Sequence, residues 1–152
     1  MKLRFYFLPL LMAAAAVGSA PALRAEEGEM RPSRSEVRRE AIALIDAQLA
    51  AFRSHDLKKA YRLAAVSLRE QFSLTRFTET VRQGYPEIWN NSRAEYGIVQ
   101  DNGVRALLNV RVFQLDGVSA SYDYVLLKEP GGWRIAGVTP HGVPPATSSD
   151  SA

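Results

Sequence analysis

The sequence predicts an α+β domain in which three helices precede a curved four-stranded antiparallel meander and pack on one of its faces. Apolar residues recur at helical spacing as far as about residue 84, and from residue 93 they alternate with a period of two. Two hairpin turn signals, Asp116-Gly117 and Glu129–Gly132, separate the last three strands. Helices followed by a meander are typical of domains that stack the helices on a single sheet face.

The chain begins with the pattern of a cleavable secretory signal peptide over residues 1–22. Lys2 and Arg4 precede an uncharged apolar run, and Ala20-Pro21-Ala22 fits the small-residue site of a signal peptidase. Cleavage after Ala25 is the alternative. The apolar run has about 13 residues, whereas a membrane-spanning helix needs about 20. We therefore expect an exported protein, periplasmic or secreted from a bacterium, with no stable membrane anchor after cleavage.

Charge and composition exclude several classes of function. The chain has 19 basic and 16 acidic residues, and loss of Lys2 and Arg4 with the signal peptide leaves it almost neutral. A nucleic-acid partner is therefore not implied. The absence of cysteine excludes disulfides and zinc–thiolate sites. His55 and His141 are far apart in the sequence and no nucleotide fingerprint is present, so we expect neither a metal site nor a cofactor.

A flexible leader is predicted over residues 23–34, and the single domain over 35–139. Ser33 and Glu36 have the spacing of a capping box, which favours a helix that begins near Ser35. The apolar stripe that extends this helix to about Arg53 consists of Val37, Ala41, Leu44, Ile45, Leu49 and Phe52.

Two shorter helices follow. Asp56 is a good cap for the second helix, and Ser73 precedes the third. Ser67 offers a cap for a single turn between them at most. Gly84 fits the end of the third helix, and Pro86 prevents its continuation.

Four strands are predicted, at residues 93–99, 104–115, 118–128 and 133–139, and a disordered tail follows at 140–152. If the Asp116-Gly117 loop has two residues, Val110 lies opposite Asp123 and Arg111 opposite Tyr122. The second turn places Lys128 opposite Trp133. The face predicted to pack under the helices then carries Val104, Ala106, Leu108, Val110, Val112, Val125, Leu127, Ala136 and Val138.

The opposite face is predicted to be amphipathic and rich in aromatic residues, which would be an unusually large exposed patch on a monomer. It would meet a second subunit, a partner or a ligand, and a homodimer is the main expectation. The interface candidates on this face are Arg111, Phe113, Tyr122, Tyr124 and Trp133.

Asp123 is the one candidate catalytic residue. The predicted register puts its carboxyl group on the apolar face, where burial would raise its pKa towards the range useful for a general acid or base. The alternative is a structural role near the open end of the sheet, or a pair with Arg134. Tyr61, Tyr85, Trp89 and His55 are candidates to line an apolar cavity or its mouth, although packing explains the aromatic residues equally well.

The order of these parts resembles the nuclear-transport-factor-2-like superfamily, whose cone-shaped (cystatin-like) α+β fold places helices before a curved meander. The strings that carry the resemblance are Ala41–Phe52 with His55-Asp56, Phe77 with Gly84-Tyr85-Pro86, Asp116-Gly117, Tyr122, and Gly132–Ile135 with Gly137-Val138. Together they are similar to an uncharacterised bacterial family, domain of unknown function 4864. The resemblance implies the fold and no particular activity.

Three hypotheses about function remain. The first is a non-enzymatic exported module that binds a small apolar ligand or a protein partner. The second is an isomerase or dehydratase in which Asp123 acts with Tyr61 or Tyr85. The third is an envelope interaction module that uses the N-terminal arginines Arg38 and Arg39.

Overall fold

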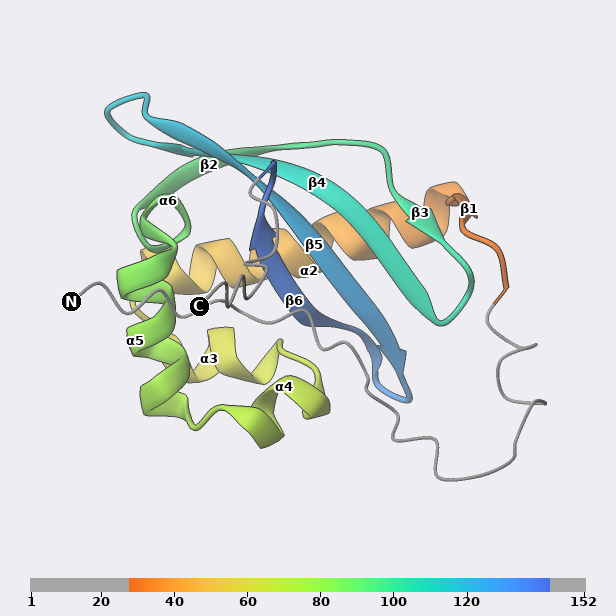
Figure 1. Cartoon of the computed structure of the whole chain (residues 1–152), viewed down its shortest axis with the longest axis horizontal. Coiled ribbons are helices and arrows are strands. Elements are labelled where there is room, and N and C mark those ends of the chain that lie inside the picture. Colours follow the sequence, from red (N-terminus) through yellow and green to blue (C-terminus); the bar gives the residue numbers. More distant parts are fainter. Residues whose placement is uncertain (1–27, 143–152) are drawn as a thin grey trace, which may run out of the picture.

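The computed structural model describes residues 28–142, and the predicted signal peptide lies outside them. Five helices and six strands occupy this part of the chain (Figure 1). In chain order they are β1 (Arg31–Pro32), α2 (Ser35–Arg53), α3 (Leu57–Arg62), α4 (Val66–Gln71), α5 (Leu74–Gly84), α6 (Pro86–Trp89), β2 (Asn91–Tyr96), β3 (Gln100–Asp101), β4 (Arg105–Gln114), β5 (Ser119–Glu129) and β6 (Gly132–Pro140).

The helices follow the sequence pattern closely. Helix α2 has the predicted bounds, and its apolar stripe is buried from Ala41 to Phe52. The Asp56 carboxylate caps α3 by accepting a hydrogen bond from the Lys59 amide, and the Ser73 hydroxyl caps α5 in the same way. The α+β order of the prediction is therefore confirmed.

Two predicted helix ends are different. Ser33 does not cap α2, because its hydroxyl donates a 2.5 Å hydrogen bond to the Asp101 carboxylate and so ties the chain to β3. Pro86 does more than end α5: Tyr85 caps that helix, and Pro86 is the first residue of the short helix α6. The single turn expected near Ser67 is helix α4, of six residues.

The sheet has six strands instead of the predicted four. The strand order is β1-β3-β4-β5-β6, with β2 paired to the same edge of β4 as β3, and every pairing is antiparallel. Strand β1 lies within residues predicted as a flexible leader. It pairs with β3 through Arg31 and Pro32 and shortens the exposed sheet edge.

The strand predicted at 93–99 corresponds to β2, which ends at Tyr96, and a separate short strand, β3, lies beyond the predicted end at residues 100–101. The Gly97 amide donates to the Asn109 carbonyl (2.8 Å) directly after β2. A Cβ atom at position 97 would lie 3.2 Å from that oxygen, so the close approach of the two backbones favours glycine.

The hairpin between β4 and β5 has a three-residue loop, Leu115–Gly117, instead of the predicted two. Gln114 pairs with Val118 across this loop, and Gly117 closes it in the left-handed conformation (φ 88°). The register is therefore shifted by one residue: Val110 lies opposite Tyr122, and Asn109 opposite Asp123. Because side chains alternate along a strand, this shift exchanges the two faces of β5 relative to the prediction.

The exchange corrects the predicted core. On β4, Ala106, Leu108, Val110 and Val112 are buried as expected, whereas Val104 is 51% exposed. On β5, Val125 and Leu127 lie on the outer face, and the side chains that pack under the helices are Tyr122, Tyr124 and Leu126.

The start of strand β6 pairs with β5 in the predicted register, with Lys128 opposite Trp133. Because the faces of β5 are exchanged, Trp133 and Ile135 are also buried in the core. A β-bulge beside Val125 and Leu126 then inserts Ala136 as an extra residue, which returns Val138 to the inner face. The predicted core position of Ala136 is therefore wrong and that of Val138 is right.

All the helices lie on the inner side of the sheet, where α2 crosses the strands and α3, α4 and α5 gather at one end (Figure 1). The β4–β5 hairpin projects beyond this layer. Within residues 28–142, no helix is both long and apolar enough to cross a membrane.

The hairpin register predicts the effect of a substitution at Gly117. Gly117→Ala places a side chain in the left-handed region and should lower the free energy of unfolding by about 1 kcal/mol. Gly131→Ala in the β5–β6 turn is the control, because a Cβ there meets only the end of the Arg134 side chain. Urea denaturation measures both variants, and equal losses would contradict the left-handed closure of the loop.

Candidate functional site

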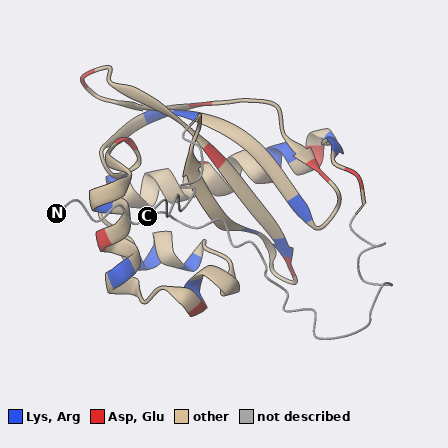
Figure 2. Ribbon diagram, in the orientation of Figure 1, with Lys and Arg blue, Asp and Glu red and all other residues tan. Residues whose placement is uncertain are grey.

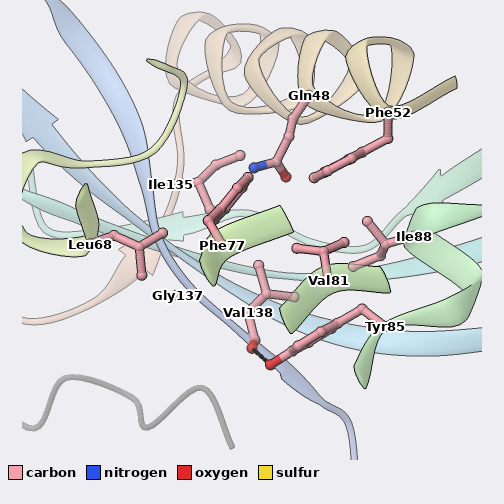
Figure 3. Close-up of a pocket in the computed structure, with 10 residues that line it drawn as sticks. All are labelled: Gln48, Phe52, Leu68, Phe77, Val81, Tyr85, Ile88, Ile135, Gly137 and Val138. Atoms are coloured by element: carbon pink, nitrogen blue, oxygen red, sulfur yellow. Dashed lines mark hydrogen bonds between the residues drawn. The ribbon is translucent and has the colours of Figure 1, made fainter. Parts of the chain in front are cut away.

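A cavity of about 20 Å³ lies between the helices and β6. Figure 3 shows the ten residues that line it. They come from α2, α4, α5, α6 and β6 and from Tyr85, the residue between α5 and α6. The ten residues are Gln48, Phe52, Leu68, Phe77, Val81, Tyr85, Ile88, Ile135, Gly137 and Val138. The rings of Phe52 and Phe77 stack at 6.0 Å, which gives the cavity one aromatic wall.

Gln48 is the exceptional residue of this lining. Its side chain is 3% exposed and points from α2 into the cavity (Figure 3). The amide makes no hydrogen bond with any of residues 28–142. Its nitrogen and oxygen are not among the fully buried atoms that lack a partner, so the amide keeps some contact with the cavity space and is open to a ligand in an otherwise apolar site.

Sequence reasoning did not single out Gln48, although a signal was present. Position 48 lies four residues after Leu44 and four before Phe52, within the apolar stripe of α2. A polar residue at a core position of a helix is the pattern that would have found it.

Three lining side chains are slightly more exposed than the others. Leu68 on α4, Val81 on α5 and Val138 on β6 are 5–8% exposed, whereas the other lining side chains are 1–3% exposed. Beside them the Tyr85 hydroxyl donates a 2.8 Å hydrogen bond to the Val138 carbonyl and connects the end of α5 to β6. We define Leu68, Val81 and Val138 as the mouth of the cavity.

Of the four predicted pocket residues, Tyr85 alone lines the cavity. Tyr61 packs edge-on against Phe77, and its hydroxyl donates to the carbonyls of Arg69 and Phe72. Trp89 packs against Phe52 from outside. These two residues support the cavity walls. His55 is exposed in the turn after α2, where its backbone is left-handed (φ 56°).

Asp123 lies on the outer face of the sheet and not among the core residues where the predicted register put it. Its carboxylate accepts a hydrogen bond from Asn109 and lies 2.8 Å from Nδ1 of His141. The side chain is 46% exposed. Asp123 therefore faces away from the cavity. The predicted alternative to a catalytic role is a pair with Arg134, and the structure shows a pair with His141 instead.

Three of the predicted interface residues, Tyr122, Tyr124 and Trp133, are buried in the core. The Tyr122 hydroxyl donates to Glu87 (2.5 Å), whereas the Tyr124 hydroxyl has no partner among the described residues. Burial raises the pKa of both phenols well above the usual value, and for Tyr122 the Glu87 hydrogen bond adds to the effect. Both hydroxyls are therefore protonated at physiological pH.

Arg111 and Phe113 keep their predicted place on the outer face. The Arg111 Nε donates to the Ser119 hydroxyl, and the guanidinium of Arg93 lies 3.7 Å from the centre of the Phe113 ring. With the tyrosines and Trp133 inside, this face loses most of the aromatic surface on which the predicted homodimer depended. The homodimer stays a prediction.

The cavity lining offers little for proton transfer. Tyr85 is its one titratable residue, and the phenol proton is already donated to a backbone carbonyl. Among residues 28–142, no three His, Asp or Glu side chains are grouped in a way that could hold a metal ion. The arrangement can bind a neutral group through Gln48 and surround it with hydrocarbon.

Comparison with known proteins identifies the family. Residues 34–146 match the model of the family described as Domain of unknown function (DUF4864). The chain belongs to this family. No curated protein and no solved structure matches it.

The unpaired Gln48 amide predicts an unusual gain of stability. Gln48→Leu replaces the amide by a side chain of similar size, and should raise the free energy of unfolding of the ligand-free protein by about 1–2 kcal/mol. Gln83→Leu, at an exposed position of α5, is the control and should change it by less than about 0.5 kcal/mol. Chemical denaturation measures both. Destabilisation by Gln48→Leu would mean that the amide has a partner in the folded protein.

Proposed function

We propose that this protein is an exported, non-catalytic binding module that holds a small, neutral and largely apolar ligand in the cavity under its helices. The observation that carries the proposal is the Gln48 amide, which is 3% exposed, has no partner among the described residues and points into an apolar cavity. Natural domains rarely leave such a group unpaired unless a ligand or a water uses it.

The chemistry of the lining supports binding over turnover. An isomerase or dehydratase of the kind considered above needs a carboxylate beside its substrate. The lining contains no acid, and Asp123 is on the opposite face of the sheet. The lining also contains no charged side chain that could pair with an ion, so a charged ligand would lose its hydration without compensation.

The size of the cavity limits how the ligand is held. A volume of about 20 Å³ accommodates about one water-sized group. In the proposed complex a hydroxyl or carbonyl group reaches Gln48, and the apolar body of the ligand extends to the mouth residues Leu68, Val81 and Val138. Their side chains move aside as the ligand enters.

Export and the cone-shaped nuclear-transport-factor-2-like fold belong to the same proposal. Support for export comes from the N-terminal pattern of Lys2, Arg4 and Ala20–Ala22. Support for the fold comes from helices stacked on one face of an antiparallel sheet, with the candidate site between the two layers.

A matched pair of probes tests the proposal. Benzyl alcohol and toluene share an aromatic ring, and only the alcohol can hydrogen-bond to Gln48. The wild-type protein should bind both and prefer the alcohol by about tenfold, which is the worth of one buried hydrogen bond. NMR titration of the methyl groups of Leu68, Val81 and Val138 gives the two dissociation constants.

Gln48→Leu should remove the preference for the alcohol while toluene still binds. Gln83→Leu should leave both affinities unchanged. If neither probe shifts the methyl resonances of the mouth at millimolar concentration, the proposed function is wrong.

A further inference from the structure

The net charge of the domain is concentrated on three helices. Between Asp56 and Gly84, the segment that contains α3, α4 and α5, there are six basic and three acidic residues. The remainder of residues 28–142 has ten of each sign. The near-neutral total hides this distribution, which Figure 2 shows as Lys and Arg bands on each of the three helices.

Most of these cations have no acidic partner. Among the described residues, Lys58, Lys59, Arg62 and Arg82 are exposed and form no ion pair. Exposed cations without an acidic partner favour an anionic group supplied from outside the domain. Arg69 is half-buried and its Nε is fully buried, so the accessible charge rests on the four exposed residues.

The charged helices also carry residues of the cavity lining, since Leu68 lies on α4 and Val81 on α5. Val66, also on α4, is 46% exposed. Its backbone amide donates a 2.9 Å hydrogen bond to the Glu129 carboxylate. An exposed apolar residue on a layer of cationic helices suits the headgroup region of an anionic bilayer, whereas a soluble polyanion would gain nothing from Val66.

We propose that the surface formed by α3, α4 and α5 binds peripherally to membranes that contain anionic lipids. Lys58, Lys59, Arg62 and Arg82 contact lipid phosphates, and Val66 enters the interface. The membrane contact does not depend on the proposed ligand site, because it rests on the exposed cations and on Val66.

Vesicle co-sedimentation tests the proposal. The chain is used from Met1 and from Leu23, so that any contribution of the apolar segment at 5–17 appears as the difference between the two forms. Both should bind vesicles of phosphatidylglycerol and phosphatidylcholine more tightly than vesicles of phosphatidylcholine alone. Raising the salt concentration should weaken the binding.

Two triple variants with the same change of charge locate the surface. Lys58→Gln/Lys59→Gln/Arg62→Gln on α3 should lower the partition coefficient into phosphatidylglycerol vesicles by about 100-fold. Each cation removed accounts for a factor of about tenfold or less. Arg34→Gln/Arg38→Gln/Arg39→Gln, at the start of α2, should lower it by less than about threefold. Circular dichroism shows whether each variant is folded.

Several outcomes would overturn the membrane proposal. These are an equal loss in the two triple variants, equal binding to vesicles with and without phosphatidylglycerol, and binding of soluble polyphosphate without binding of vesicles. Loss of probe binding in the cavity with intact vesicle binding would contradict the proposed function alone.

Discussion

The three-residue turn between β4 and β5 is the constraint on which the interior depends. Gly117 closes this turn in a backbone conformation that other residues adopt only with strain, and the closure puts Val110 opposite Tyr122. Every side chain of β5 then takes its face from that one pairing. Tyr122 and Tyr124 pack under the helices and Asp123 faces outward. With two residues in the loop, the same sequence would bury a carboxylate and expose two tyrosines.

The helical layer packs on the sheet and leaves a small cavity between the two layers. Apolar side chains of α2, α5 and β6 belong to the core around it, and the cavity has about the volume of one water molecule. The Gln48 amide beside this cavity contributes no hydrogen bond to the fold within residues 28–142, unlike the other polar groups that connect the layers. Proteins often give up stability where they bind ligands. An unpaired amide beside a cavity in the core is therefore better explained by binding than by folding.

Local patterns predicted the helices well, since each depends on residues close in sequence: the stripe of α2, the Asp56 cap and the Ser73 cap. The turn at Asp116-Gly117 was also predictable, but its length was not, because two- and three-residue loops share that dipeptide. One residue of difference exchanged the faces of β5 and misplaced the candidate site. Strand β1 could not be predicted, because it exists only through pairing with β3, about 70 residues away in the sequence.

The most direct test of the account is the side-chain amide resonance of Gln48 in a ¹⁵N–¹H spectrum, assigned by its loss in Gln48→Leu. Addition of benzyl alcohol should shift this resonance and produce intermolecular nuclear Overhauser effects to the ring protons of the ligand. The amide resonances of Gln83 and Gln114 should not move. An unchanged Gln48 resonance at saturating ligand, or one already protected from solvent exchange by a hydrogen bond in the free protein, would contradict the claim that this amide is the recognition group.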